Sequence, residues 1–320
     1  MPLAMEYQEL PELDLPVSRL GLGGCPLGGH GWGPVDESQL RAAVRRALEA
    51  GVNLFDTADI YGLGQSEYLL SEALGKARQH VVIASKFGVR RTSDGRTLFD
   101  NSPEYLEQAL TASLQRLGLE QIPLYYLHWP DGRTPIEEAV GAMQRCRERG
   151  LIGAIGLSNV SAEELRRACQ TTRISAVQVQ YSLVDREVAE ALAGTAAEFG
   201  VPLITWGSLA QGLLTGKFDE HSQFTADDRR SRYENFQGEK FAENLRVVTR
   251  LKQAAAIYRR TPGQTAMRWL LDAPSVGCVL FGAKNPEQVE ENLGAVNWRL
   301  SQSDRRILTG SPAQRMLRVA

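Results

Sequence analysis

The sequence predicts an α/β protein folded as a (β/α)8 (TIM) barrel, and three observations point to it. Short β-branched apolar runs alternate with longer amphipathic segments along the whole chain, which is typical of βαβ units. Eight such runs occur, the number that closes a parallel barrel. The GxGxxG fingerprint of an open doubly wound sheet is absent from the first strand-to-helix turn, which reads GLGGC over residues 21–25. We therefore expect one barrel domain over residues 1–320.

The expected strands and helices follow one another in order. The strands are expected at residues 17–22, 52–55, 81–85, 122–127, 152–157, 176–180, 203–205 and 276–281. The helices are expected to begin near Glu37, Ser66, Pro103, Pro135, Ala162, Glu187, Ala242 and Pro286, with a short last helix near Ser301. Several starts carry Ser, Asp or Pro at the cap or in the first turn, where these residues favour helix initiation.

The connection from residue 208 to about residue 240 breaks this alternation. It is rich in glycine and in charged residues such as Asp227, Asp228, Arg229 and Arg230, and it reads as too polar and irregular for a packed element. A structureless loop of this length is usually functional or disordered. Because it follows the carboxyl end of the seventh strand, we interpret it as a lid over the site, with a solvated insertion as the alternative.

The composition is that of an ordinary globular protein. Lys and Arg number 36 against 38 Asp and Glu, a formal net charge of −2, and no concentrated basic face is apparent, so nucleic-acid binding is not expected. Apolar stretches fall far short of the ~18 residues of a membrane span, and the start of the chain does not resemble a signal peptide, so we expect a cytoplasmic protein. The four cysteines lack metal-ligand spacing, which predicts free thiols and no metal site.

Three consecutive strands end in a titratable residue. Asp56, Lys86 and His128 directly follow the second, third and fourth expected strands. In a closed parallel barrel the carboxyl ends of all strands meet on one face, where barrel enzymes build their active sites. Tyr61, five residues after Asp56, lies within reach of the same rim. Each residue alone has a plain structural interpretation, as a cap, a loop charge, a core histidine or a packing aromatic, but their convergence favours a catalytic site.

Together these side chains suit the protonation of an oxyanion. A phenol with the ordinary pKa of ~10 is a poor proton donor at neutral pH, and an adjacent ammonium lowers that pKa, so we expect Lys86 to lower the pKa of Tyr61. A neutral His128 can orient a carbonyl oxygen, while Asp56 keeps Lys86 charged. Because none of these residues supplies a hydride, carbonyl reduction requires a cofactor.

Motifs around these residues resemble the aldo-keto reductase family. The segment FDTADIYG, which contains Asp56 and Tyr61, and the pairs Ser85-Lys86 and His128-Trp129 resemble its catalytic tetrad. Further matching motifs are Gly153-x2-Gly156-x-Ser158-Asn159, Gln178-x-Gln180-Tyr181, LAQGLLTGK at 209–217 and GAKNPxQxxEN at 282–292. The resemblance implies a (β/α)8 barrel that reduces an aldehyde or ketone with NADPH, with Tyr61 as the proton donor.

The resemblance also implies how NADPH is held. Ser158, Asn159 and Gln180 resemble the groups that bind the carboxamide, and Trp206 resembles the aromatic that stacks on the nicotinamide ring. Residues 208–217 resemble the pyrophosphate clamp, and Lys284 precedes a helix start suited to the 2′-phosphate. The implied cofactor-binding residues are Gly24, Cys25, Asp56, Ser158, Asn159, Gln180, Trp206, Gly207, Ser208, Leu209, Gln211, Gly212, Lys217, Gly282, Lys284, Gln288, Glu291 and Asn292.

Three positions depart from the family pattern. The chain reads Gly207-Ser208-Leu209 where the family usually has Ser-Pro-Leu, and Phe281 stands where many members have proline. Gln288 stands where many well-known members have arginine, which leaves Lys284 as the main charged contact expected for the 2′-phosphate.

The expected substrate is a small carbonyl compound. Trp32, Trp129 and the loop at residues 90–96 are candidate walls of its pocket. Two other functions stay open at this point. One is a non-catalytic, NADPH-sensing subunit of the channel-associated type found in one branch of the family. The other is a barrel aldolase that uses Lys86 as a Schiff-base nucleophile.

Overall fold

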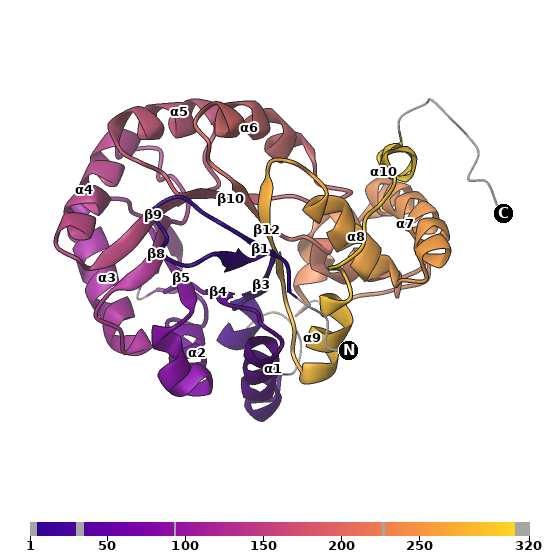
Figure 1. The fold of residues 1–320 in the computed structure, drawn as a ribbon, viewed down its shortest axis with the longest axis horizontal. Coiled ribbons are helices and arrows are strands. Elements are labelled where there is room, and N and C mark those ends of the chain that lie inside the picture. Colours follow the sequence, from indigo (N-terminus) through magenta and orange to yellow (C-terminus); the bar gives the residue numbers. More distant parts are fainter. Residues whose placement is uncertain (1–4, 30–34, 93, 226–227, 311–320) are drawn as a thin grey trace.

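Eight short apolar segments form a closed parallel barrel, as the sequence predicts. The computed structural model describes residues 5–29, 35–92, 94–225 and 228–310, and within them eight strands close in the order β10-β11-β12-β3-β4-β5-β8-β9. The barrel strands are β3 (Leu20–Gly23), β4 (Leu54–Asp56), β5 (Val82–Phe87), β8 (Ile122–Leu127), β9 (Ile152–Ser158), β10 (Ala176–Gln180), β11 (Leu203–Trp206) and β12 (Val276–Phe281). Figure 1 shows them at the centre of a ring of helices.

Each barrel strand is followed by a helix that covers the outside of the barrel. These helices are α1 (Glu37–Glu49), α2 (Gln65–Leu74), α3 (Pro103–Leu117), α4 (Ile136–Glu148), α5 (Ala162–Thr171), α6 (Glu187–Glu198), α8 (Pro262–Leu271) and α9 (Pro286–Leu293). Side-chain caps start several of them: Ser161 and Thr261 form capping boxes at α5 and α8, and Asp36 caps α1. The helix α10 (Gln302–Leu308) lies near the expected Ser301, which caps it.

The segment between β11 and β12 contains two helices where the sequence predicts one. The expected helix near Ala242 begins earlier, as α7 (Gly238–Tyr258), and α8 follows it after a short turn. The turn is made by Arg259, whose backbone is left-handed (φ 52°). Arginine carries none of the sequence signal that glycine gives at a helix end, so the apolar pattern of α7 runs on into α8. Both α7 and α10 lie outside the ring of helices in Figure 1.

The amino end of the barrel is closed by a hairpin that the sequence does not predict. β1 (Tyr7–Gln8) pairs with β2 (Val17–Ser18), and Leu10 and Val17 join the side chains that fill the barrel interior. The expected strand 17–22 is therefore divided. The N–H of Arg19 donates to Glu6 of the hairpin (2.8 Å), while its carbonyl accepts from Val279 of β12 (2.9 Å), so the chain changes partners at that residue.

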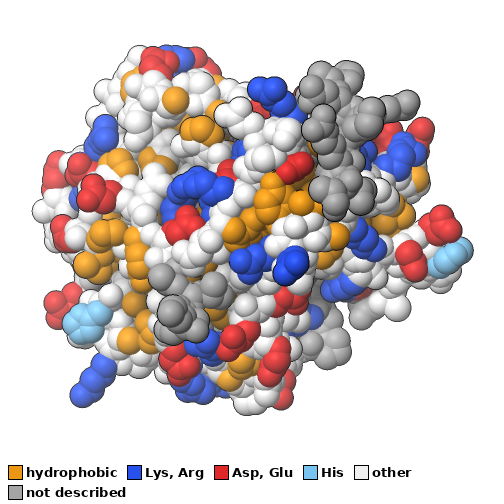
Figure 2. All heavy atoms as spheres, turned by 45° about the vertical axis from the view of Figure 1, so that its right-hand side comes forward, with side chains coloured by type: hydrophobic (Ala, Val, Ile, Leu, Met, Phe, Trp, Pro, Cys, Tyr) orange, Lys and Arg blue, Asp and Glu red, His pale blue; other side chains and the backbone are white. Residues whose placement is uncertain are grey.

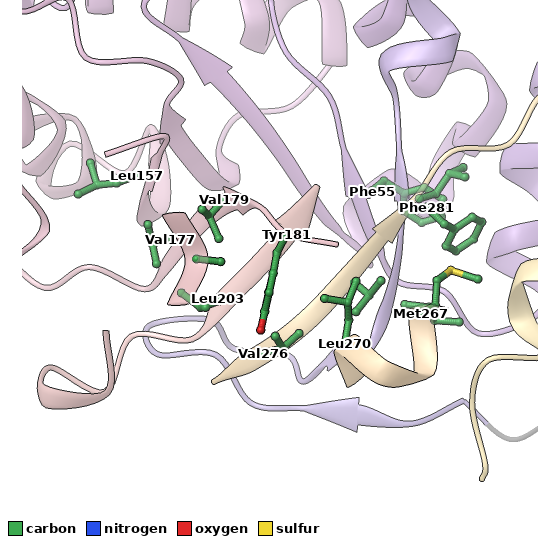
Figure 3. Close-up of a cluster of buried hydrophobic side chains, with 14 of the residues drawn as sticks. Phe55, Leu157, Val177, Val179, Tyr181, Leu203, Met267, Leu270, Val276 and Phe281 are labelled. Carbon is green, nitrogen blue, oxygen red and sulfur yellow. The ribbon is translucent and has the colours of Figure 1, made fainter. Parts of the chain in front are cut away.

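A second apolar layer lies between the barrel and its helices. Figure 3 shows side chains of β9, β10 and β11, such as Leu157, Val177 and Leu203, in this layer. Met267 and Leu270 of α8 belong to the same buried cluster. This layer fixes the directions of the strands, and with them the positions of the residues at their carboxyl ends.

The expectation that the connection 208–240 is structureless is wrong. It contains 3₁₀ helices at Ala210–Thr215, Arg229–Arg232 and Glu234–Phe236, and α7 already begins at residue 238. Its core is aromatic: the rings of Phe218, Phe224 and Phe236 lie 5.0–5.6 Å apart, and the ring of Phe241 lies 5.9 Å from that of Phe236 in a tilted arrangement. These phenylalanines are spaced too irregularly to give a helical or strand period, so the charged residues between them dominate the sequence pattern.

Another unpredicted hairpin follows β5. β6 (Val89–Arg91) pairs with β7 (Thr97–Phe99), at the place of the expected pocket loop 90–96. Figure 2 shows Lys and Arg side chains interspersed with Asp and Glu on one face of the molecule, with hydrophobic side chains near its middle. None of the helices that the structure describes is long and apolar enough to cross a bilayer. None of the four cysteines forms a disulfide, and the described residues hold no group of His, Cys, Asp and Glu side chains suited to a metal ion.

The barrel interior makes one glycine essential. A Cβ at Gly156 of β9 would clash with the ring of Tyr126, which is 1% exposed and fills the barrel beside it. We expect Gly156→Ala to lower the free energy of unfolding by about 1–3 kcal/mol through overpacking. Gly194 of α6 is the matched control, because a Cβ there meets nothing and alanine favours a helix. Urea unfolding of both variants checks this, and an equally stable Gly156→Ala protein would contradict it.

Candidate active site

Asp56 and Lys86 form a buried ion pair at the carboxyl ends of β4 and β5. Nζ of Lys86 donates to Oδ1 and Oδ2 of Asp56 at 2.7 and 2.8 Å, and to the carbonyl oxygen of Thr57 at 2.8 Å. The side chain of Lys86 is 0% exposed and that of Asp56 is 5% exposed. An ammonium has three donors, and all three are used here. Burial of both charges is tolerable only because each meets the other with full hydrogen bonding.

Gln178 of β10 holds the pair from across the barrel mouth. Its Nε2 donates to Oδ2 of Asp56 at 2.7 Å, and its side chain is buried. The sequence alone does not indicate this role of Gln178, although the residue belongs to the Gln178-x-Gln180 motif. Residues two apart on a strand face the same side, so the expected cofactor contact at Gln180 was the signal that could have found it.

Tyr61 and His128 complete the group that the sequence predicts at this rim. Nζ of Lys86 lies 5.1 Å from the centre of the Tyr61 ring, and the rings of Tyr61 and His128 meet edge to face at 5.8 Å. The backbone N–H of His128 donates to Phe87 at the end of β5, which fixes the start of its loop (2.8 Å). The structure thus brings Asp56, Tyr61, Lys86 and His128 together.

His128 is a neutral imidazole at neutral pH. Its side chain is buried, and burial first, then the charge of Lys86, hold its pKa well below the ordinary 6.5. Its Nδ1 is buried and finds no hydrogen-bond partner in the described part of the chain. A neutral imidazole carries one N–H group, which can donate a hydrogen bond to a carbonyl oxygen as long as it is not already bonded to another protein group.

The phenol of Tyr61 titrates in the direction opposite to our expectation. Burial, followed by the charges of Cys25 and Asp56, holds the pKa of Tyr61 well above 10, and only Arg229 among the main influences lowers it. Lys86 is not among the main influences on this pKa, whereas Asp56, whose two oxygens its ammonium contacts, raises it. The phenol therefore keeps its proton at neutral pH.

Asn159 ties together the strand ends beside this group. It has a left-handed backbone (φ 59°), and its Nδ2 donates to the carbonyl of His128 and to Oγ of Ser158, both at 2.9 Å. Its Oδ1 accepts from Nε1 of Trp206 at 3.2 Å. Gln180 and Trp206 lie opposite each other in the β10–β11 register. The four residues expected to bind a nicotinamide are thus neighbours at the ends of β9, β10 and β11.

The expected pyrophosphate clamp has an unusual backbone. Ala210, Gln211 and Gly212 have φ values of 45°, 54° and 92°, a left-handed run that is unfavourable for the two non-glycine residues. Gly207 is also left-handed (φ 66°), and Ser208 is buried with its Oγ 3.0 Å from that of Thr205. Leu209 precedes the 3₁₀ helix Ala210–Thr215, and Lys217 follows it.

The expected 2′-phosphate residues lie in the loop between β12 and α9. The N–H of Lys284 donates to Oε1 of Gln288, and the N–H of Gln288 donates to Asn285, both at 2.9 Å. Asn292, which we expected to face adenine, is buried and donates to the carbonyl of Gly282 (3.5 Å). Glu291 is exposed. Gln288 and Asn292 therefore hold the loop against its own helix.

The remaining expected contacts lie at the first strand. The N–H of Gly24 donates to the carbonyl of Asp56 at 2.6 Å, and Cys25 begins a 3₁₀ helix (Cys25–Gly28). On the proposed substrate side, Trp129 is 39% exposed and its ring lies 6.4 Å from that of Phe99 in β7, a neighbour that the sequence did not indicate. Trp32 lies outside the described residues.

The long connection reaches this site through residues that sequence analysis did not single out. Arg229 hydrogen-bonds the phenol of Tyr233, and its positive charge lowers the pKa of Tyr61. The charge of Cys25 also acts on Tyr233. The 3₁₀ helix Arg229–Arg232 therefore lies near the catalytic candidates, although it is more than a hundred residues away in sequence.

The chain is similar to known proteins over most of its length. The sequence profile described as "Aldo/keto reductase family" matches residues 19–311. The chain is 33% identical over 304 residues to the aldo-keto reductase yakc [NADP(+)] of Schizosaccharomyces pombe (91% and 89% of the two chains). It is 33% identical over 315 residues to the NADH-specific methylglyoxal reductase of Escherichia coli (94% and 96%). Its fold matches the glycerol dehydrogenase AKR11B4 of Gluconobacter oxydans with a TM-score of 0.89 and 30% identity (95% and 94%).

The buried ion pair makes a prediction about stability. Asp56→Asn leaves the ammonium of Lys86 buried without a counter-charge, so we expect the free energy of unfolding at pH 7 to fall by about 3–5 kcal/mol. The double variant Asp56→Asn/Lys86→Met removes both charges and should recover most of that loss. Urea unfolding measures both proteins. Arg96→Gln, which breaks a solvent-exposed pair with Asp94, is the control and should leave stability unchanged. A double variant as unstable as Asp56→Asn would contradict this account.

Proposed function

Because the chain belongs to the aldo/keto reductase family and is an NAD(P)H-dependent reductase of carbonyl compounds, we propose that it uses NADPH to reduce a small aldehyde or ketone, with Tyr61 as the proton donor. The observation that carries the proposal is the buried group of Asp56, Tyr61, Lys86 and His128, in which phenol, ammonium and imidazole lie within about one side-chain length of one another. Lys86 and Asp56 position the phenol, and His128 orients the carbonyl.

The residues around the catalytic group fit a nicotinamide dinucleotide. Asn159 and Gln180 supply amide groups at the strand ends, and Trp206 supplies an aromatic face. The buried Oε1 of Gln211 has no hydrogen-bond partner within the described ranges, which suits a clamp completed by a ligand. Lys217 and Lys284 supply positive charge for the phosphates. When bound, NADPH supplies the hydride that no side chain can provide.

The residues of the chain then manage the proton. Reduction turns the carbonyl oxygen into an alkoxide, a much stronger base than a phenolate, so the phenol of Tyr61 can protonate it although burial keeps its pKa high. The phenolate formed lies over the ammonium of Lys86, 5.1 Å from the ring centre, which stabilises the new charge. A hydrogen bond from neutral His128 to the same oxygen orients it toward the phenol.

The positions of the outer residues support a lid and a substrate wall. We propose that Trp129, with Phe99 beside it, borders the substrate, and that the described part of the connection 208–240 covers the cofactor. Arg229 of this connection lowers the pKa of Tyr61, so it lies near the phenol, which supports the connection as a lid over the site. Two relatives differ in their cofactor, one being labelled for NADP(+) and the other NADH-specific. Lys217 and Lys284 favour NADPH here, because only NADPH carries the additional phosphate.

The hydrogen bonds of Lys86 argue against the aldolase alternative. A Schiff-base lysine must be a free neutral amine when it attacks a carbonyl. Nζ of Lys86 donates hydrogen bonds to both carboxylate oxygens of Asp56 and to the carbonyl of Thr57. Its nitrogen therefore has no lone pair available to attack a carbonyl. We therefore assign Lys86 a role in positioning and charge stabilisation.

The proton-donor role is tested by Tyr61→Phe. We expect kcat for carbonyl reduction to fall by about 10²–10⁴-fold, as for the loss of a general acid. The affinity for NADPH, measured by fluorescence titration, should stay the same. Tyr68→Phe on α2 is the matched control, because Tyr68 is 53% exposed and should tolerate loss of its hydroxyl. Normal turnover by Tyr61→Phe would refute the role.

The pH dependence of reduction follows from Asp59. Burial, and then the charge of Glu67, raise the pKa of Asp59 to about 8, and its carboxylate in turn raises the pKa of Tyr61. As the pH rises through about 8, Asp59 becomes charged, the phenol becomes a weaker acid, and kcat should fall by a few-fold. His128 is already neutral above pH 7 and adds no step there.

Asp59→Asn should level this profile. The asparagine stays neutral, so we expect kcat measured with saturating NADPH to be constant from about pH 7 to pH 9 in that variant. Tyr105, whose hydroxyl donates to Oδ2 of Asp59 at 3.3 Å, keeps an acceptor in asparagine. A profile with the same fall near pH 8 in both proteins would show that another group titrates there.

A further inference from the structure

Two loops beside the proposed catalytic group are connected by one buried asparagine. Asn101 lies between β7 and α3 and is 2% exposed. Its Nδ2 donates to the carbonyl oxygen of Trp129 at 3.0 Å, and its Oδ1 accepts from the backbone N–H of Asp131 at 2.7 Å. Its own backbone N–H donates to Oδ2 of Asp131 at 2.9 Å. A Cβ at Gly88 would lie 2.6 Å from the Nδ2 of Asn101, so the glycine leaves room for this amide.

Asp131 fixes the part of the loop after β8 that Asn101 contacts. Its Oδ1 accepts from the backbone N–H groups of Arg133 and Thr134 at 2.8 and 2.7 Å, and its Oδ2 accepts from Oγ1 of Thr134 at 2.8 Å. Burial acts to raise the pKa of Asp131, but hydrogen bonds from backbone N–H groups, that of Asn101 first, hold it below its ordinary value. Hydrogen bonds to a charged carboxylate are among the stronger ones in proteins. The loop therefore presents a fixed partner to Asn101.

The same loop begins with His128, and a second asparagine holds that residue. The backbone N–H of His128 donates to the carbonyl of Phe87 at 2.8 Å, and its own carbonyl accepts from Nδ2 of Asn159 at 2.9 Å. The next carbonyl, that of Trp129, accepts from Asn101. Two asparagine amides, one from each side of the loop, thus bind successive peptide carbonyls. Together they fix the backbone of Trp129 relative to that of His128.

The hairpin of β6 and β7 places a second aromatic ring beside this loop. The ring centres of Phe99 and Trp129 lie 6.4 Å apart with an angle of 56° between the planes, and the side chains are 41% and 39% exposed. Nη2 of Arg133 donates to the carbonyl of Phe99 at 2.9 Å, a further hydrogen bond between the two loops. We call the rings of Phe99 and Trp129 the aromatic wall. An apolar group that packs on this wall removes both rings from water, which is favourable.

We propose that Asn101 is a positioning residue that holds the aromatic wall in place beside His128, and so determines how tightly carbonyl substrates with a large apolar body are bound. The inference rests on the proposed function, since it concerns the substrate side of the same site. Asn101 acts through Trp129 and the hairpin rather than by touching the substrate. An asparagine suits this role because its amide offers a donor to Trp129 and an acceptor to Asp131 at once.

Asn101→Ala tests this role with two aldehydes, benzaldehyde, which carries an aromatic ring, and propanal, which does not. With saturating NADPH we expect the KM for benzaldehyde to rise about 3- to 10-fold, which corresponds to the loss of one aromatic contact. The KM for propanal and both kcat values should stay within about two-fold. Such a split between KM and kcat, confined to one substrate, is not expected from a residue that only stabilises the fold.

Ser102→Ala is the matched control, at the next position in the chain. Oγ of Ser102 caps α3 by accepting from the N–H of Tyr105 at 3.3 Å and donates to Oδ1 of Asp100 at 2.7 Å. Its loss weakens the start of the same helix and leaves the amide of Asn101 intact. We expect this variant to be less stable than the wild type and to keep both KM values.

Two further variants keep the test decisive if Asn101→Ala folds poorly. Arg133→Ala removes the hydrogen bond to the carbonyl of Phe99 from an exposed side chain, and it should raise the KM for benzaldehyde in the same direction. In a Trp129→Ala background, Asn101→Ala should not change the ratio of the two KM values further, because the wall that it positions is already lost. Hydrogen exchange in residues 128–134 should become faster in Asn101→Ala and not in Ser102→Ala.

Three results would overturn the proposal. Equal rises of both KM values in Asn101→Ala would leave the residue a structural role only, and an unchanged or lower KM for benzaldehyde would exclude a wall that depends on it. A further change of the ratio in the Trp129→Ala background would show that Asn101 acts by another route. Failure of the proposed function looks different, because the wild-type protein would then oxidise NADPH with neither aldehyde. Hydrogen exchange would still show whether Asn101 holds the loop.

Discussion

The buried ion pair of Lys86 and Asp56 is the constraint on which the site depends. Two charges that are almost completely excluded from water must satisfy each other, and this requires β4 and β5 to be neighbours in register at the carboxyl end of a closed barrel. The carbonyl of Thr57 and the amide of Gln178 complete the hydrogen bonds that the pair cannot supply itself. The barrel therefore supplies more than a scaffold, because β10, on the opposite side of the mouth, contributes to the same charge network.

The pair also decides how the neighbouring groups titrate. A lysine alone beside Tyr61 would make the phenol more acidic, but here burial and the charge of Asp56 are larger influences and raise the pKa of the phenol. The pKa of His128 shifts in the other direction, because burial and the charge of Lys86 lower it, and the imidazole is neutral. Both groups are thus kept in the uncharged form, so a charge arises in the site only when the reaction creates one. The ammonium stabilises that charge only once it appears on the phenolate.

The sequence predicts the parts of this molecule that repeat or that follow from topology. All eight barrel strands are apolar runs, and the meeting of Asp56, Lys86 and His128 follows once the strands are parallel and closed. It does not predict features that depend on single contacts in space. Arg259 ends α7 without a glycine, and irregularly spaced phenylalanines give the long connection a core. The direction of the Tyr61 pKa shift depends first on how completely the phenol is buried, which no pattern of residue types encodes.

The two ends of the proposed cofactor site differ in charge for a physical reason. At the catalytic end the charges of Lys86 and Asp56 are paired, whereas at the far end the charges of Arg230 and Lys284 lower the pKa of Lys217. One short 3₁₀ helix, Arg229–Arg232, connects the two ends. Arg229 lowers the pKa of Tyr61, and the next residue, Arg230, lowers the pKa values of Lys217 and Lys284. Adjacent residues in one helical turn cannot move independently. The two ends of the site are therefore connected through adjacent residues of one short helix.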